Sequence, residues 1–452
     1  MYWANFLHIY QPPTQKEIWV RRIADESYRK IFSGLLKIKR AKLTLNINGI
    51  LCELLDKYGG RDILENIKQL LKSGNLELTG SAKYHAFLPL LPESEIERQI
   101  RLNEEALTKY FGKNWKKGGF FSPEMAYSKK VAQIASRLGY HWIIVDELGF
   151  PKGPDKISSR VIYEIDELKN FFCFFRERNF SFKILSASQI STLPALLRFL
   201  GSRFGKSEYT VTAMDGETFG HHRPGLENLL FDLLKEERII PMTMGDLITK
   251  FKKREIIEPL PSTWASASKD IKTKQPFTRW HNPKNIIQKY QWELTNLAME
   301  VVNRNPKQSS RQLLDEALHS DQYWWASARP WWSLEMIERG AFELKRLILK
   351  SPTATPAEKQ TTEELYKNIV YAGFEWQRSG LVDELSRQEN EEVSERLEEK
   401  EKLFITKEDY ELMIKTLNEQ MHLAAKSEEY HRAAMIKDRI RELNEEMKKA
   451  DV

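Results

Sequence analysis

Apolar runs that end in polar, glycine-containing loops recur along the first 250 residues, and helical patterns separate them. The clearest run, 209–214, combines β-branched and aromatic residues, which predicts a buried strand. Further strands are predicted at 3–7, 42–48, 76–79, 118–122 and 141–145, with weaker candidates at 161–165, 171–175 and 182–185. Helices are predicted at 63–71, 93–110, 128–138 and 190–200. About seven such units predict a parallel α/β sheet closed into a barrel.

The pattern changes after residue 261, where long helical periodicities replace the strands. Helices are predicted at 283–304, 309–318, 334–349 and 358–376. Residues 387–408 are dense in charge and poor in apolar groups, which indicates a solvated helix or a linker. Residues 410–447 give two helical segments with small alanines, which favours an antiparallel hairpin that docks on a partner.

The amino-acid composition excludes several classes of protein. With 452 residues, 41% of them hydrophobic and 11% aromatic, the chain can bury the cores of more than one domain. The 70 basic and 64 acidic residues leave a net charge of +6 spread along the chain, so we expect no nucleic-acid partner. No apolar run approaches the roughly 18 residues that cross a bilayer, and the amino terminus lacks a signal-peptide pattern. Two cysteines are too few for a disulfide framework, so we expect a cytoplasmic protein with no membrane association.

Ionisable side chains crowd behind the strand at 209–214. Asp215 and Glu217 are followed by His221, His222 and Arg223. A solvent-facing turn is the plain alternative, since Asp-Gly is a common turn signal. A turn has no need of two histidines, however, so we favour a functional site at this strand end.

Two other predicted strands end in residues that can carry chemistry. His8 follows the first strand, although a hydrogen-bonded core histidine would look the same. Glu124 lies between Pro123 and Met125 after an aromatic strand, where little water is expected and its proton affinity should rise. The alternative for Glu124 is a cap on the helix that follows, because acids favour the first turn of a helix.

Tryptophans gather in the helical part of the chain, with four of them between residues 324 and 332. Clustered tryptophan is most often the packing core between helices. The functional alternative is a flat aromatic platform on which sugar rings stack.

Three functions are compatible with these residues. Glu124 and Asp215 on separate strand ends could face one pocket, as glycoside chemistry requires of its two carboxylates. Alternatively, Asp215, His221, His222 and His8 could bind a divalent metal in a deacetylase-like hydrolase, although no HxxH or HExxH spacing supports this. The third possibility is a non-catalytic carbohydrate-binding scaffold that recruits a partner through the carboxyl-terminal hairpin.

Five blocks, in order, resemble the motifs of glycoside hydrolase family 57. They are HIYQP from His8, GNLELT from Gly74, FSPEMA from Phe121, MDGETFG from Met214 and SDQYWW from Ser320. The resemblance implies an incomplete (β/α)7 barrel followed by an all-helical domain, and retaining action on α-1,4-glucans without metal or cofactor. It is the resemblance that makes Glu124 the nucleophile and Asp215 the general acid/base. The residues expected to bind substrate are His8, Tyr10, Gln11, Glu77, His85, Glu217, His221, Trp264, Asp321 and Trp324.

The chain departs from this family at two places. Tyr10 stands where the family has a second histidine, and a phenol cannot become a cation near neutral pH. Residues 417–443 resemble the UVR motif of nucleotide-excision-repair proteins, from which we expect a helical hairpin for a protein partner and no role in DNA repair.

The resulting prediction is an amylase or 4-α-glucanotransferase that acts on maltooligosaccharides by double displacement. Its expected parts are a catalytic barrel at 1–260, a helical domain at 261–385 that completes the cleft, a charged linker at 386–409 and a helical hairpin at 410–452.

Overall fold

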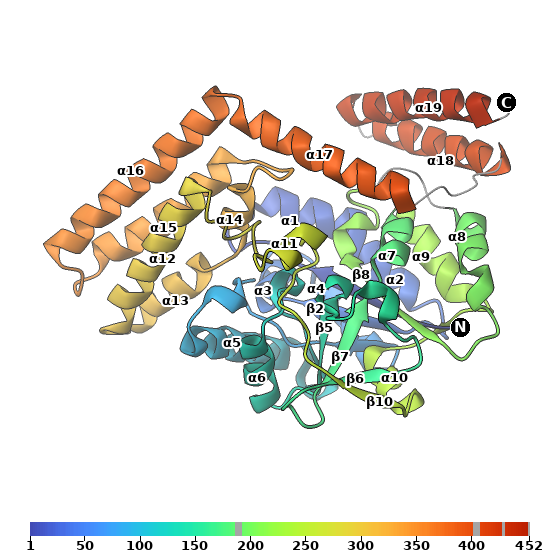
Figure 1. The fold of residues 1–452 in the computed structure, drawn as a ribbon, viewed down its shortest axis with the longest axis horizontal. Helices are drawn as coiled ribbons and strands as arrows, with labels where there is room; N and C mark the ends of the chain where they lie inside the picture. The colour runs from blue at the N-terminus through green and yellow to red at the C-terminus, as the bar shows by residue number, and fades with distance from the viewer. Residues whose placement is uncertain (186–191, 401–406, 427–429, 451–452) are drawn as a thin grey trace.

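Parallel strands at the centre of the amino-terminal half organise the fold (Figure 1). The structure, a computed structural model, describes residues 1–185, 192–400, 407–426 and 430–450. The strands are β1 (Tyr2–Ile9), β2 (Leu43–Ile47), β3 (Leu76–Leu78), β4 (Gly119–Phe120), β5 (Trp142–Asp146), β6 (Ile162–Ile165), β7 (Phe172–Arg176), β8 (Tyr209–Asp215), β9 (Ile240–Pro241) and β10 (Arg254–Ile257).

The strands form two sheets that together make an incomplete seven-stranded barrel. One sheet has the order β3-β2-β1-β8, with β9 against the start of β1, and the other has the order β10-β6-β7-β5-β4. A parallel bridge between Gly80 and Phe120 joins β3 to β4. Across the other seam, the Glu177 backbone N–H donates to the Val211 carbonyl oxygen of β8 at 2.8 Å. The expected incomplete (β/α)7 barrel is therefore confirmed, with β1, β2, β3, β4, β5, β7 and β8 as its parallel strands.

Helices cover the outside of this barrel (Figure 1). They are α1 (Glu17–Ile23), α2 (Arg29–Leu35), α3 (Gly49–Lys57), α4 (Arg61–Lys72), α5 (Glu93–Phe111), α6 (Lys129–Arg137), α7 (Arg178–Leu185), α8 (Leu193–Leu200), α9 (Leu226–Lys235) and α10 (Met244–Lys250). Large side chains, among them Phe6, Phe121 and Trp142, fill the barrel interior, so the barrel is a packed core.

The strand predicted at 182–185 is wrong, because these residues belong to helix α7. The letters FSFKIL alternate as a strand would, yet Phe180 and Ile184 lie one helical turn apart and are both buried. The helix predicted at 190–200 is observed as α8, while residues 190 and 191 lie outside the described residues.

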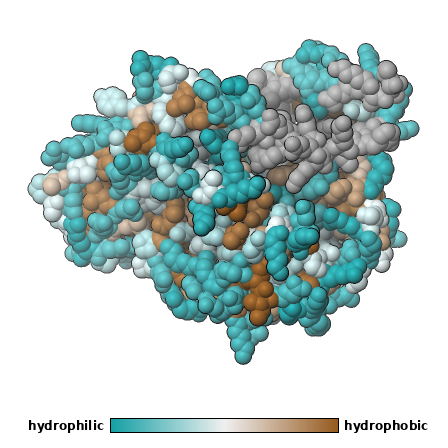
Figure 2. Space-filling view, in the orientation of Figure 1, coloured by the Kyte–Doolittle hydropathy of each residue, from teal (hydrophilic) through white to brown (hydrophobic). Residues whose placement is uncertain are grey.

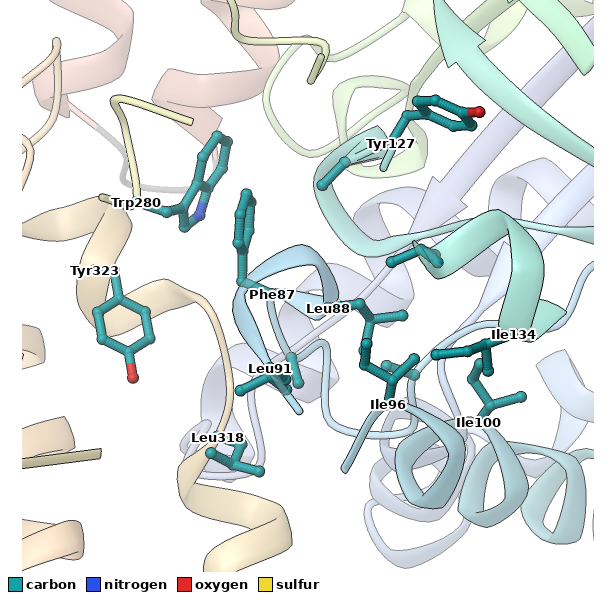
Figure 3. Close-up of a cluster of buried hydrophobic side chains, with 14 of the residues drawn as sticks. Phe87, Leu88, Leu91, Ile96, Ile100, Tyr127, Ile134, Trp280, Leu318 and Tyr323 are labelled. Atoms are coloured by element: carbon teal, nitrogen blue, oxygen red, sulfur yellow. The ribbon is translucent and has the colours of Figure 1, made fainter. Parts of the chain in front are cut away.

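The second half of the chain is helical, as predicted. It contains α11 (Ser268–Lys272), α12 (Ile286–Asn303), α13 (Gln308–Ala317), α14 (Asp321–Trp325), α15 (Leu334–Lys350) and α16 (Pro356–Arg378). Its aromatic side chains pack onto the barrel: Trp280 stacks on Phe87 with ring centroids 4.7 Å apart. Figure 3 shows the continuous hydrophobic cluster in which this pair and Tyr323 meet apolar side chains of the 87–134 segment.

Helix α17 (Leu381–Lys400) occupies much of the range predicted as a charged linker. One of its acids, Glu389, is buried and forms an ion pair with the buried Arg279 at 2.6 Å. Arg279 lies 110 positions away, so local charge density could not reveal this anchor.

The expected carboxyl-terminal hairpin is present. Helices α18 (Lys407–Lys426) and α19 (Tyr430–Ala450) lie side by side (Figure 1). Tyr410, Met413, Leu417 and Leu443 form a small core between them. Because this cluster is separate from the barrel core, the hairpin has its own hydrophobic contacts.

The surface seen in Figure 2 is mostly hydrophilic, with hydrophobic residues in separate patches. In the described part of the chain, no helix combines the length and the apolar character needed to cross a bilayer.

Candidate active site

The carboxyl ends of the parallel strands bring several of the predicted site residues together. His8 near the end of β1 is the register partner of Asp215 at the end of β8. His85 follows β3, and Glu124 follows β4. Because these strands run parallel, their ends share one face of the barrel, and the site lies on that face.

Glu124 is held in an unusual conformation by Trp264. Its backbone has φ 62° and ψ 18°, the left-handed region that a residue with a Cβ rarely adopts. The Trp264 indole Nε1–H donates to Glu124 Oε2 at 2.9 Å, and the Trp264 backbone N–H donates to the Glu124 carbonyl oxygen at 3.3 Å. Burial raises the pKa of Glu124 to about 8, and the indole hydrogen bond opposes this rise.

Arg178 fixes the loop that carries Trp264. Its guanidinium donates to the carbonyl oxygens of Trp264 at 3.1 Å and of Ser266 at 2.9 Å. Asp146, fully buried at the end of β5, accepts from Arg178 Nε at 2.7 Å. Sequence reasoning missed Arg178, because nothing near an arginine in the sequence shows which distant carbonyl oxygens it will bind.

Asp215 reaches solvent although protein atoms crowd around it, as a side chain on the wall of a concave site does. Its incomplete hydration raises the pKa of Asp215 to about 6, and the positive charge of Arg176 opposes this rise. The charge of Asp215 in turn contributes to the raised pKa of Glu124. The two carboxyl groups are therefore close enough to influence each other's ionisation.

His8 and His85 form a hydrogen-bonded pair beside these carboxyl groups. His8 Nδ1 lies 2.8 Å from Asn46 Oδ1, and His8 Nε2 lies 3.1 Å from His85 Nε2. His85 Nδ1 lies 2.9 Å from Ser320 Oγ and 3.9 Å from Glu124 Oε1. Burial lowers the pKa of His8 well below its ordinary value and that of His85 to about 4, so both rings are neutral near pH 7. Ser320, which the sequence reasoning did not select, connects this pair to the helical half of the chain.

Tyr10, the departure from the family pattern, packs directly against this pair. Its ring stacks on His85 with centroids 4.1 Å apart, and its hydroxyl donates to Asp321 Oδ2 at 2.7 Å. Asp321 also lies 3.0 Å from Nδ1 of His319. Burial alone would raise the pKa of Asp321, but its interactions with His319, His85 and Tyr10 together outweigh burial and lower that pKa. At this position of the family motif, the Tyr10 hydroxyl therefore serves as a hydrogen-bond donor to the Asp321 carboxylate.

Glu217 and Gln11 support the loop under Asp215. Glu217 Oε1 accepts from the Tyr10 backbone N–H at 3.0 Å and from the Tyr28 hydroxyl, to which Gln11 Nε2 donates at 3.2 Å. Burial, together with the charge of Asp215, raises the pKa of Glu217 to about 8. Both side chains are thus engaged by protein groups next to the site.

Three other predicted residues contact groups outside this cluster. Glu77 accepts from the Gly245 backbone N–H at 2.9 Å, at the start of α10 and toward the amino ends of the strands. His221 Nδ1 contacts Glu26 Oε2 at 2.5 Å, and Trp324 packs against Trp280 with centroids 5.3 Å apart. A match to a sequence motif does not predict toward which end of the barrel, or toward which neighbouring element, these side chains point.

The metal-binding alternative finds no support in this geometry. Among the described residues, no three His, Cys, Asp or Glu side chains are arranged to hold a metal ion. His8 and His221, two of the residues in that alternative, contact different partners.

The ring of parallel strands, with ionisable side chains at its carboxyl end, defines the chain as an α/β-barrel protein. Comparison with known sequences is more specific. The chain belongs to glycosyl hydrolase family 57, whose sequence profile matches residues 6–259. The profile of the UvrB/UvrC motif matches residues 411–446, in the carboxyl-terminal hairpin.

Individual relatives are distant. An α-amylase of Pyrococcus horikoshii is 22% identical over 324 residues, which are 63% of this chain and 47% of that protein. The chain thus spans about half the length of this curated relative.

Solved structures share the fold. A 4-α-glucanotransferase of Thermococcus litoralis matches with a TM-score of 0.62 and 17% identity, over 77% of this chain and 59% of that one. A branching enzyme of family 57 from Thermococcus kodakaraensis matches with a TM-score of 0.61 and 16% identity, over 82% and 96% of the two chains.

Proposed function

We propose that this protein is a retaining enzyme that acts on α-1,4-glucans, with Glu124 as nucleophile and Asp215 as general acid/base. The observation that carries the proposal is the electrostatically coupled pair of carboxyl groups at the ends of two barrel strands, both with a raised pKa. Membership of family 57 and relatives named as an α-amylase and a 4-α-glucanotransferase support the substrate class.

The contacts of the two acids favour this division of roles. The indole N–H of Trp264 occupies Oε2 of Glu124, which orients the carboxylate and leaves Oε1 to attack the anomeric carbon. Asp215 is the acid that solvent reaches, so it can exchange protons with an incoming acceptor.

The reaction follows from these roles in two steps. Protonated Asp215 donates its proton to the glycosidic oxygen while Glu124 forms an ester with the anomeric carbon. Asp215, now a carboxylate, removes a proton from the acceptor, whose oxygen displaces Glu124 and restores the starting configuration. Water as acceptor gives hydrolysis, and a sugar hydroxyl gives transfer.

Neutral His8 and His85 would donate or accept hydrogen bonds to sugar hydroxyls without adding charge beside Glu124. Asp321, held by Tyr10 and His319, comes from the helical half of the chain. We therefore propose that residues 261–385 complete the cleft that begins on the barrel at residues 1–260.

Replacement of each acid by its amide tests the proposal. We expect Glu124→Gln and Asp215→Asn each to abolish turnover of maltoheptaose, with an unchanged circular dichroism spectrum. The exposed Glu335 and Asp232 provide matched controls, and Glu335→Gln and Asp232→Asn should retain full activity. Near-normal turnover by either site variant would refute the assigned roles.

Product analysis distinguishes an amylase from a 4-α-glucanotransferase. Maltoheptaose converted only to shorter sugars indicates hydrolysis, whereas the additional appearance of longer linear chains indicates transfer. New branch points would instead place the protein with the branching enzyme among its structural neighbours.

We also propose that the hairpin of α18 and α19 binds a protein partner. The UvrB/UvrC profile match and the hairpin's separate hydrophobic core support this role. A chain that ends at residue 400 lacks both helices and should lose the partner. If it captured the same partner as the full-length protein, the proposal would be contradicted.

A further inference from the structure

Three neighbouring strands place charged side chains at the end of the barrel interior. One layer deeper, the interior core contains Ile144 of β5, Phe174 of β7 and Ala213 of β8. Alternate residues of a strand face the same side of a sheet. The next inward positions, at the carboxyl ends of the same strands, are Asp146, Arg176 and Asp215. A charged layer therefore closes the interior directly below the proposed active site.

Arg176 connects Asp146 to the strand that carries Asp215. Asp146 and Arg176 are register partners, and Arg176 Nη1 donates to Asp146 Oδ2 at 3.3 Å. Arg176 Nε donates to the carbonyl oxygen of Ala213, two residues before Asp215, at 2.8 Å. The positive charge of Arg176 also keeps the pKa of Asp215 below the value that burial alone would give. Arg176 thus holds the end of β8 and determines the charge beside Asp215.

Arg178 connects the same carboxylate to the loop that orients Glu124. Its Nε donates to both oxygens of Asp146, at 2.7 and 2.9 Å. Its Nη2 donates to the carbonyl oxygens of Trp264 and Ser266, and the Trp264 indole donates to Glu124. The carboxylate of Asp146 therefore fixes the direction in which Arg178 reaches the loop.

This cluster is buried, so its members depend on one another. The side chains of Asp146, Arg176 and Arg178 are 0%, 4% and 12% exposed. A buried charge that loses its partner strongly destabilises the arrangement around it. Two further acids lie near the cluster: burial and the charges of Asp146 and Glu177 raise the pKa of Glu147, whose carboxyl group accepts from the Arg178 backbone N–H at 3.1 Å.

We propose that Asp146 is a positioning residue that both catalytic acids share. Through Arg176 it holds the strand end that presents Asp215. Through Arg178 it holds the loop whose indole orients Glu124. The roles of the two acids in this inference rest on the proposed function, but the links from one buried carboxylate to both of them are a separate feature of the barrel.

Two substitutions should move the acidic limb of the pH profile of kcat/KM in opposite directions. Asp146→Asn leaves the charge of Arg176 unbalanced, so the pKa of Asp215 should fall and the limb should move to lower pH. Arg176→Met removes that charge, so the limb should move to higher pH. Glu124 and Glu217, which also interact with Asp215, stay in both variants. Simple damage to the fold lowers activity without opposite shifts.

Arg178→Met should act on the other acid. It removes a positive charge and releases the loop of Trp264, so the pKa of Glu124 should rise and the basic limb should move to higher pH. On maltoheptaose, kcat should fall by up to about a hundredfold with little change in KM, because the reacting group is misplaced. Asp62, which forms an exposed ion pair with Arg29, provides the control, and Asp62→Asn should leave both limbs in place.

Thermal melting tests the inference without any turnover. The folded-state pKa of Asp215, about 6, lies above its ordinary value of 3.8. The protein should therefore lose stability relative to its Asp215→Asn variant as the pH rises from 3.8, and the loss should level off near pH 6. With Asp146→Asn in both proteins, the loss should level off at lower pH. With Arg176→Met in both, it should level off at higher pH.

The results separate this inference from the proposed function. If the wild-type protein leaves maltoheptaose intact, the proposed function fails, and the melting curves decide the inference. If Asp146→Asn does not fold, Arg176→Met and Arg178→Met each leave the buried carboxylate one arginine partner and supply the test. Folded arginine variants with unmoved pH limbs and unmoved melting behaviour would overturn the inference. Shifts of the acidic limb in the same direction in Asp146→Asn and Arg176→Met would overturn it as well.

Discussion

The indole Nε1–H of Trp264 donates to Oε2 of Glu124 at 2.9 Å, while the backbone N–H of Trp264 donates to the Glu124 carbonyl oxygen at 3.3 Å. Trp264 therefore fixes both the backbone and the carboxyl group of the proposed nucleophile. A hydrogen bond to a charged group contributes roughly 1.5–3 kcal/mol, about ten- to a hundredfold in rate if it is fully used in the reaction.

Trp264→Phe keeps an aromatic ring but removes this donor. We expect kcat/KM on maltoheptaose to fall by about ten- to a hundredfold. The basic limb of the pH profile should move to higher pH, because the lost hydrogen bond stabilises the ionised form of Glu124 and its removal raises the pKa of Glu124, the higher of the two carboxyl pKa values. Trp331, 60% exposed, is the control, and Trp331→Phe should leave that limb in place. A loss of activity without any shift of the pH profile would contradict this role of the indole.

The pH dependence of activity should reflect the coupled carboxyl groups. With pKa values of about 6 for Asp215 and about 8 for Glu124, the pair holds one proton between these limits. Double displacement needs the proton on Asp215 and an ionised Glu124, which is the minor arrangement of the singly protonated pair because Glu124 has the higher pKa. Its population still follows that of the singly protonated pair, so kcat/KM should be bell-shaped with its maximum between about pH 6 and 8. A constant kcat/KM from pH 5 to pH 9 would contradict this coupling.

Stability should depend on pH at the same site. The folded-state pKa of Glu124, about 8, is raised above the ordinary value of 4.5, so the neutral acid contributes stability that is complete below the unfolded-state pKa. That contribution is lost as the pH rises toward 8. Because glutamine stays neutral, Glu124→Gln should melt above the wild type at pH 8, with a smaller difference at pH 5. Thermal melts at the two values measure this, and an equal difference at both would argue against the raised pKa.

The buried ion pair of Arg279 with Glu389 should anchor helix α17. Arg279→Met leaves the Glu389 carboxylate buried without this partner, which typically destabilises a protein by roughly 3–5 kcal/mol. Limited proteolysis within α17 should accelerate, and the double variant Arg279→Met, Glu389→Leu should recover much of the loss. Unchanged proteolysis in the single variant would show that other contacts hold the helix.

The sequence was most informative where local pattern determines structure. Apolar runs that end in an acid or a histidine correctly placed Asp215, His8 and Glu124 at strand ends, because parallel strands present their carboxyl ends at one face. Sequence analysis failed where the role of a residue depends on a partner far away in the chain. Arg178 and Ser320 are ordinary residues until the fold brings carbonyl oxygens or His85 beside them.

Glu77 and residues 182–185 illustrate a second limit. Periodicity placed Glu77 within a strand but could not show that its carboxyl group would meet the start of α10. The alternation at 182–185 was too short to distinguish a strand from the helix that is observed.

The central claim is that Glu124 attacks the sugar, and covalent trapping tests it most directly. A 5-fluoro-α-glucosyl fluoride slows the second step, so the sugar should accumulate on the enzyme as an ester. Peptide mapping by mass spectrometry should find one added hexosyl group on Glu124, and none in Glu124→Gln protein. A label on any other carboxylate, or steady turnover of the reagent without a label on Glu124, would contradict the account.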